Sequence, residues 1–111
     1  MSDCIFCKIV AGEIPSAKLY EDDKIIVIND VNPGAPVHVL IIPKLHTDNI
    51  LHAPKDLLPY IQSKLEEIVK ILGIDEKGFR IVINTGVDGG QSVNHLHFHL
   101  LGGKTLGWPP C

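Results

Sequence analysis

The stretch His95-Leu96-His97-Phe98-His99 alternates three imidazoles with two large apolar side chains. An extended strand explains this spacing, because side chains two residues apart lie on the same face of a strand. The three histidines are therefore expected on one face, about 7 Å apart, while Leu96 and Phe98 face a core. Two other interpretations remain open: a His-rich strand face in solvent, and a metal site, because alternating histidines can ligate zinc.

Size and composition indicate one globular domain over residues 1–111, with 45% hydrophobic residues, 21% charged residues and a net charge of −3. The negative charge gives no electrostatic reason to expect nucleic acid or an anionic membrane as a partner. The longest apolar run, residues 39–42, is too short to span a bilayer. The first residues lack the pattern of a secretory signal, so a cytoplasmic location is expected.

Hydrophobic periodicity predicts five short strands and one long helix. The strands are expected over residues 18–21, 24–29, 37–42 and 79–84 and over the histidine stretch, which ends at Gly102-Gly103. The long helix is expected over residues 56–72, with Gly73 as its stop and an apolar face of Leu58, Ile61, Leu65, Ile68, Val69 and Leu72. A short helix is expected over residues 4–11. Together these elements favour an α+β fold with a largely antiparallel sheet.

The loop before the histidines, residues 88–93, contains Gly89 and Gly90 followed by Gln91 and Ser92. Glycines let backbone N–H groups approach an anion closely, and the two polar side chains add donors, so this loop could cradle a phosphate. A tight hairpin turn is the simpler alternative. A row of imidazoles beside an anion cradle suggests chemistry at phosphorus.

In that chemistry, a neutral His97 would attack phosphorus in line, and water would then cleave the phosphoimidazole. His99 would donate to the phosphate or to the leaving group. His38, on an apolar strand, is either a core residue or a group that orients a catalytic imidazole. Asp30 follows a strand and precedes a turn, where its carboxylate could accept from two ribose hydroxyls or form an Asx-type turn.

Cys4 and Cys7 form a Cys-x-x-Cys pair, with Cys111 as a third cysteine. In a cytoplasmic protein this pattern indicates metal or redox chemistry before a structural disulfide. The pair has zinc-ligand spacing, and His46 and the histidine stretch supply imidazoles. Two thiols packed on a helix are one alternative. A redox pair is the other, although no surrounding pattern suggests a thioredoxin-like unit.

Residues 95–101 resemble the histidine triad signature, in which three histidines alternate with apolar residues. The resemblance covers nearly the whole chain and includes residues 4–9, 12–15, 43–46 and 89–93. The tail, which ends in Trp108-Pro109-Pro110, is similar to the Hint branch, the histidine triad nucleotide-binding proteins. This resemblance implies the HIT-like fold and a homodimeric purine nucleoside phosphoramidase, which cleaves the P–N bond of nucleoside 5′-phosphoramidates and leaves the monophosphate.

The resemblance also implies roles for individual residues. The nucleophile is His97, and the other catalytic residues are His99, His38 and Ser92. The phosphate is bound by Gly90, Gln91 and Ser92 with Asn84 upstream, and the ribose by Asp30 beside Val31. The purine slot is lined by Phe6, Ile9, Ile28 and Leu40. Trp108 reaches toward the partner subunit's site and helps to choose the leaving group. Asn94 stands where relatives often carry an aromatic residue.

Many bacterial relatives that resemble this chain hold a zinc ion, which implies a site made by Cys4, Cys7, His46 and His95. A closed four-ligand shell is structural, because a catalytic zinc keeps one position open. The ion would pin the N-terminal helix against the sheet and would not be required for catalysis. Two other functions stay open: a zinc-stabilised nucleotide-binding module that engages a partner protein with negligible turnover, and a dinucleoside polyphosphate hydrolase.

Overall fold

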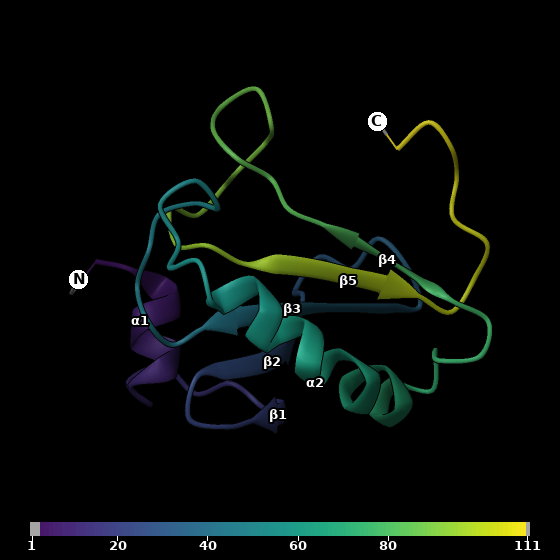
Figure 1. The fold of residues 1–111 in the computed structure, drawn as a ribbon, viewed down its shortest axis with the longest axis horizontal. Helices are drawn as coiled ribbons and strands as arrows, with labels where there is room; N and C mark the ends of the chain where they lie inside the picture. The colour runs from purple at the N-terminus through teal and green to yellow at the C-terminus, as the bar shows by residue number, and fades with distance from the viewer. Residues whose placement is uncertain (1–2, 111) are drawn as a thin grey trace.

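The computed structural model describes residues 3–110, and within them a five-stranded antiparallel sheet is accompanied by two helices (Figure 1). The strands are β1 (Lys18–Glu21), β2 (Ile25–Asn29), β3 (Val37–Pro43), β4 (Phe79–Val82) and β5 (Phe98–Gly102), in the spatial order β1-β2-β3-β5-β4. The helices are α1 (Ile5–Val10) and α2 (Leu57–Leu72). The predicted α+β fold is confirmed. Cys111, the third cysteine, lies outside the described residues.

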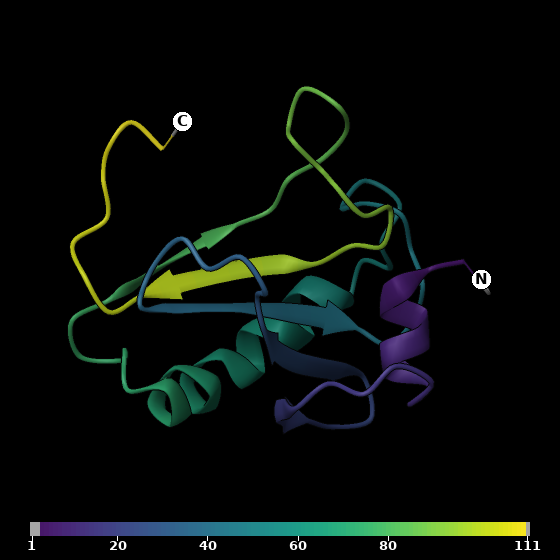
Figure 2. The same ribbon diagram turned by 180° about the vertical axis from the view of Figure 1, so that it is seen from behind.

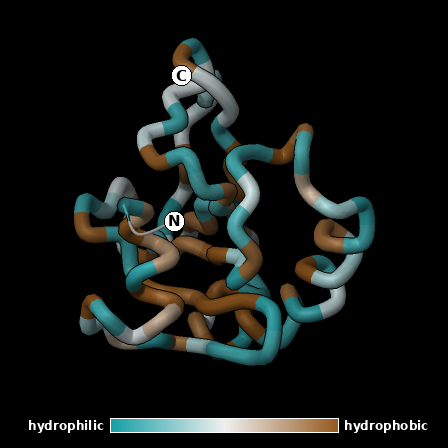
Figure 3. The backbone as a smooth tube through the Cα atoms, turned by 90° about the vertical axis from the view of Figure 1, so that its left-hand side faces the viewer, coloured by the Kyte–Doolittle hydropathy of each residue, from teal (hydrophilic) through white to brown (hydrophobic). Residues whose placement is uncertain are grey.

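The two helices pack against different parts of the sheet. α2 runs across one face, and α1 lies at one end of the sheet, as Figures 1 and 2 show from opposite sides. The larger core packs α2 against the side chains on one face of β2, β3 and β5. A second core packs α1 against the side chains on the opposite face of β2 and β3. Because β2 and β3 are covered on both faces over most of their length, their sequences consist mainly of apolar runs and do not alternate with polar residues. Figure 3 shows the hydrophilic segments mainly in the surrounding loops.

α2 begins and ends close to its predicted bounds. Gly73 follows its last residue with a φ of 73°, a left-handed conformation that glycine adopts without a steric cost. One prediction about its apolar face was wrong: Leu58 is 47% exposed, and Leu57 is buried in its place. Leu57 lies one full turn before Ile61, so it continues the stripe that faces the sheet. Within residues 3–110, neither helix is long and apolar enough to cross a membrane.

The prediction that the whole histidine stretch forms a strand was wrong, because β5 begins only at Phe98. The last paired residues of β3 and β5 are Ile41 and Phe98. Two residues further in the same register, Pro43 would lie opposite Leu96. Pro43 has no N–H to donate, and its carbonyl oxygen accepts instead from the ring of His95 at 2.8 Å. β4 likewise ends at Val82, two residues before the predicted end.

The prediction about the two faces of this stretch was nevertheless correct. Leu96, Phe98 and Leu100 are buried in the core beneath α2. The rings of His95 and His97 contact Phe6 of α1, on the other side of the sheet. The backbone from residue 95 to residue 97 is therefore extended enough to alternate its side chains without pairing as a strand.

Candidate active site and metal cluster

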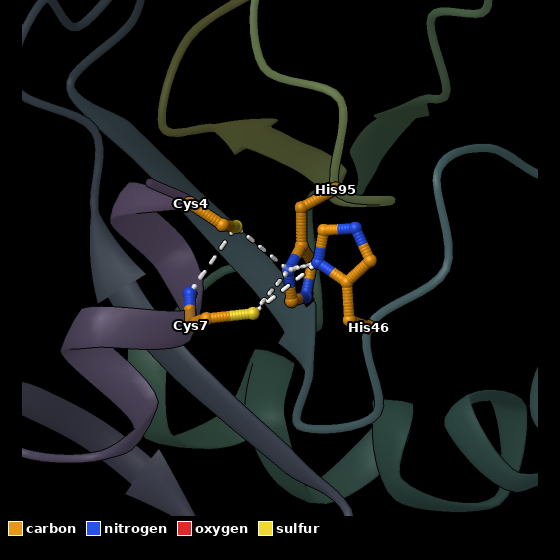
Figure 4. Close-up of side chains that lie close together, drawn as sticks. All are labelled: Cys4, Cys7, His46 and His95. Atoms are coloured by element: carbon orange, nitrogen blue, oxygen red, sulfur yellow. Dashed lines mark hydrogen bonds between the residues drawn. The ribbon is translucent and has the colours of Figure 1, made fainter. Parts of the chain in front are cut away.

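Four side chains from three distant parts of the chain converge at the N-terminal end of α1 (Figure 4). The Nδ1 atom of His95 lies 3.3 Å from Cys4 Sγ and 3.6 Å from Cys7 Sγ. The Nδ1 atom of His46 lies 3.2 Å from Cys7 Sγ and 3.1 Å from His95 Nδ1. We call these four residues the Cys/His cluster.

The first turn of α1 places both sulfur atoms on the same side. Cys4 is the N-cap residue, and its Sγ accepts from the backbone N–H of Cys7 at 3.3 Å. Residues three apart on a helix are neighbours on its surface, so the Cys-x-x-Cys spacing brings the two thiols together. The local geometry of α1 thus brings half of the cluster together within four consecutive residues.

The chemistry of the donor atoms fits a zinc ion. His95 is fully buried, and its Nε2–H donates to the Pro43 carbonyl oxygen, so its Nδ1 presents a lone pair to the sulfurs. Burial also lowers the pKa of His95 below its ordinary value of 6.5, which keeps the ring neutral. Bonds of about 2.0–2.3 Å to a tetrahedral zinc place ligand atoms about 3.3–3.8 Å apart, slightly farther than the observed separations of 3.1–3.6 Å.

The ring of His97 is held in one orientation and one tautomer. His97 is only 6% exposed, and its Nδ1–H donates to the carbonyl oxygen of His95 at 2.8 Å. Phe6 lies edge-on to it, with the ring centroids 5.0 Å apart. Because a neutral imidazole carries one proton, Nε2 of His97 is the nitrogen with a lone pair available for attack.

A chain of hydrogen bonds defines the tautomer of His99. The backbone N–H of Gly34 donates to Nδ1 of His38 at 2.9 Å, so the proton of a neutral His38 is on Nε2. That nitrogen lies 2.9 Å from Nδ1 of His99 and 3.3 Å from Oδ2 of Asp30. His99 therefore accepts at Nδ1 and carries its own proton on Nε2. His99 lies beside His97, with ring centroids 5.2 Å apart.

The strand register brings the predicted purine-slot residues to the same face as His99. Ile28 is opposite Leu40, and Leu40 is opposite His99, and directly paired residues point to the same side of an antiparallel sheet. Phe6 and Ile9 of α1 complete one buried cluster with Ile28 and Leu40. This cluster forms an apolar floor next to the histidines.

The remaining predicted site residues lie around this floor with different degrees of exposure. Asp30 accepts from the N–H of Asn32 at 2.7 Å, an Asx-type turn, while its other oxygen faces His38. Val31 is 91% exposed, and Ser92 and Gly90 are also exposed. Asn84 and Gln91 are half-buried. Trp108 is 79% exposed, and its ring lies under the guanidinium group of Arg80 at 5.7 Å.

Sequence reasoning missed the backbone groups that set the histidine tautomers. These are the carbonyl oxygens of Pro43 and His95 and the N–H of Gly34. Every residue has such groups, so no sequence pattern distinguishes these three. Only the position of Pro43 at the end of an apolar run could have indicated that its carbonyl is not used by the sheet.

The free energy of unfolding is expected to fall as the pH drops below about 6.5. Burial, followed by the neighbouring His97 and His38, lowers the pKa of His99, and burial lowers that of His95. The unfolded chain therefore takes up protons near pH 6.5 that the folded chain resists, which favours unfolding by up to about 1.4 kcal/mol per pH unit for each group. The free energy of unfolding has its full value above this pH window and decreases as the pH falls through it.

Urea unfolding between pH 7.5 and pH 5 measures this dependence. The variant His99→Gln is expected to have a shallower slope, whereas the exposed His52→Gln serves as a matched control and keeps the wild-type slope. A stability that stays constant across this pH range would contradict the prediction.

The comparisons with known proteins agree with this geometry. The family model described as HIT domain matches residues 11–106. The chain belongs to the HIT family. The HIT family hydrolase from Legionella pneumophila Philadelphia 1 is 43% identical, with a TM-score of 0.92 over 98% of this chain and 100% of that one. The predicted HIT-like fold is therefore confirmed.

Two further HIT relatives bear informative names. The histidine triad nucleotide-binding protein from Candida albicans is 40% identical, with a TM-score of 0.84, and the match covers 96% of this chain and 83% of that one. The 14 kDa zinc-binding protein of Brassica juncea is 45% identical over 97% of this chain and 99% of its own length. The protein is thus a HIT family member similar to hydrolases, and its Cys/His cluster has the donor set to hold a metal ion.

Proposed function

We propose that this HIT protein hydrolyses the P–N bond of purine nucleoside 5′-phosphoramidates through a covalent nucleotidyl-His97 intermediate. The observation that carries the proposal is the pair of complementary tautomers. The ring of His97, whose Nε2 carries the lone pair, lies beside the ring of His99, whose Nε2 bears a proton. A nucleophile and a proton donor side by side are the two groups that P–N cleavage needs.

In the first step, Nε2 of His97 forms a bond to phosphorus while the P–N bond of the substrate breaks. The amine leaves with a proton, for which the Nε2–H of His99 is the nearby donor. The positive charge that develops on His97 is stabilised by its Nδ1–H bond to the His95 carbonyl oxygen. In the second step, water attacks phosphorus and gives a proton to Nε2 of His99, which lost its own in the first step. The bond from phosphorus to His97 breaks, and the nucleoside monophosphate is released.

We assign His38 to a positioning role in this reaction. Its Nε2–H occupies Nδ1 of His99, which keeps the proton of His99 on the opposite nitrogen. Asp30 lies 3.3 Å from the same His38 nitrogen and 3.8 Å from Nδ1 of His99, so its carboxylate stabilises either ring when it gains a proton. In this proposal, Asp30 lies beside both the His38–His99 pair and the ribose of the substrate.

The apolar floor supports a planar base, and the surrounding polar residues suit a nucleoside monophosphate. The base would lie on Phe6, Ile9, Ile28 and Leu40, with the ribose near Asp30 and Val31. The phosphate would lie between the histidines and the glycine loop, near Ser92, Gly90, Gln91 and Asn84. An apolar slot contacts the faces of a base rather than its edges, so this slot does not by itself distinguish adenine from guanine.

We propose a structural zinc ion in the Cys/His cluster. Cys4, Cys7, His46 and His95 would fill all four positions of a tetrahedral ion, leaving none for substrate. Bound zinc would contribute folding energy by joining α1 to the segments that carry His46 and His95. The catalytic steps above use only groups of the protein.

We also propose a homodimer that forms at the edge of the sheet. β4 is an edge strand, and its flank exposes Phe79, Ile81 and Ile83. An unprotected edge with apolar side chains is suited to pairing with a second copy. Trp108, held near β4 by Arg80, would then reach toward the partner's site. Sedimentation analysis, which measures the mass of the particle in solution, tests the dimer. The cytoplasmic location stays a prediction.

The function is tested with two substrates on the wild-type protein. A fluorescent adenosine 5′-phosphoramidate is expected to be hydrolysed to AMP. A diadenosine polyphosphate is expected to react at least about 100-fold more slowly, because its leaving group is a phosphate rather than an amine and the site would stabilise that transition state less well. Faster cleavage of the polyphosphate would assign the protein to that other reaction. AMP binding without turnover of either substrate would instead indicate a nucleotide-binding module.

A further inference from the structure

The side chain of Gln91 uses all of its donors within the protein. Its Nε2 donates to the carbonyl oxygen of Asp48 at 2.5 Å and to that of Val93 at 3.1 Å. Its Oε1 accepts from the backbone N–H of Gly86 at 3.1 Å, and its own backbone N–H donates to the Gly86 carbonyl oxygen at 3.0 Å. A primary amide has two N–H donors, so Gln91 has none left for an anion in this conformation.

The two bonds between Gln91 and Gly86 close the loop of residues 86–91. Both Gly86 and Gly90 have a positive φ, 75° and 78°, and glycine loses the most conformational freedom on folding. A loop of this kind, exposed over most of its length, needs specific contacts to hold one shape. The Gln91 side chain supplies such contacts from inside the loop.

The bond to Asp48 joins this loop to a segment 43 residues away in the sequence. That segment follows His46 of the Cys/His cluster directly. A second bond joins the same two parts of the chain: the Leu96 N–H donates to the Thr47 carbonyl oxygen at 2.7 Å. The bonds of Gln91 and Leu96 therefore anchor both ends of residues 91–96, which connect the loop to the first histidines.

We propose that Gln91 is a positioning residue that preorganises the loop of residues 86–91 for phosphate. The inference rests on the proposed function for the nature of the ligand. It changes the role that the family resemblance implies for the Gln91 side chain, from contacting phosphate to shaping the loop. A loop that is already ordered loses less conformational freedom when the phosphate binds, so affinity for phosphate-bearing ligands depends on these bonds.

The first test is amide hydrogen exchange of the ligand-free protein. Gln91→Met keeps the length of the side chain and removes its hydrogen bonds, and Gln62→Met on the exposed face of α2 is the matched control. We expect exchange at Gly86 and Gln91 to accelerate about tenfold or more, which corresponds to one net hydrogen bond, and the control to match wild type. Unchanged exchange in Gln91→Met would overturn the proposal.

The second test compares the affinities for AMP and adenosine. Gln91→Met is expected to weaken AMP binding about tenfold, on the same hydrogen-bond estimate, and to leave adenosine binding unchanged, whereas general damage to the fold would weaken both. Weaker AMP binding with unchanged exchange would indicate a direct phosphate contact and overturn the proposal. Faster exchange with unchanged AMP binding would also overturn it, because the order of the loop would then not affect affinity. If wild-type protein binds neither ligand, the proposed function fails, and the exchange test still decides whether Gln91 holds the loop.

Discussion

Replacing His97 with alanine is expected to lower the turnover of an adenosine phosphoramidate by at least about a thousandfold, because the reaction loses its nucleophile. Nε2 of His97 carries the lone pair, since its Nδ1–H is bound to the His95 carbonyl oxygen. The apolar floor does not include this ring, so AMP is expected to bind the variant with an affinity within a few-fold of wild type. Steady-state kinetics and calorimetric titration with AMP measure the two effects.

Two controls separate chemistry from folding in this experiment. The exposed His52→Ala keeps wild-type turnover, and the thermal melting of His97→Ala shows whether the buried site tolerates the smaller side chain. Acid quenching of wild-type protein during turnover is expected to trap a nucleotidyl adduct by mass spectrometry, which the variant lacks. Substantial turnover by the folded variant would exclude covalent catalysis by His97.

Removing the structural zinc that we propose for the Cys/His cluster is expected to have the largest effect on stability. An ion present at a thousand times its dissociation constant stabilises the folded state by about 4 kcal/mol. For a domain of this size, that loss corresponds to a decrease in Tm of about 15 °C or more. Chelation at neutral pH, with metal content measured before and after, is the direct experiment. An unchanged Tm after verified removal would contradict a structural zinc.

Cysteine variants give an independent measurement of the same effect. Cys7→Ser removes one proposed ligand, whose sulfur lies 3.2 Å from Nδ1 of His46. The purified variant is expected to contain less zinc and to melt at a lower temperature. Cys111→Ser removes a cysteine that is not one of the four cluster residues, so this variant is the matched control and is expected to retain both properties. Equal metal content in the two variants would place the ion elsewhere.

Much of the architecture followed from local patterns. The apolar runs of β2 and β3 and the 3.6-residue period of α2 predicted their elements to within one residue at each end. These patterns reflect burial, which selects side chains at every position of an element. At the histidine stretch, alternation predicted the two faces correctly but placed the strand three residues too early. Side-chain alternation reports an extended backbone, whereas pairing depends on the partner strand.

The residue types of the site were also readable in the sequence. The Cys-x-x-Cys pair is local, because one helical turn brings the thiols of Cys4 and Cys7 together. Its combination with His46 and His95 came from a family resemblance, and the structure brings these four side chains together. The converging apolar residues of α1, β2 and β3 likewise came from the resemblance, since they lie far apart in the chain.

The sequence by itself determined which chemical groups are available: three alternating histidines, a cysteine pair and a glycine loop. Only the tertiary structure decided which nitrogen of each imidazole carries the proton, through the backbone groups of Pro43, His95 and Gly34. It also decided that the Gln91 side chain is hydrogen-bonded to Gly86 and Asp48 and so closes the loop that contains it. The reason is physical: hydrogen bonds to backbone groups depend on where the chain passes in space, and every residue offers the same N–H and C=O.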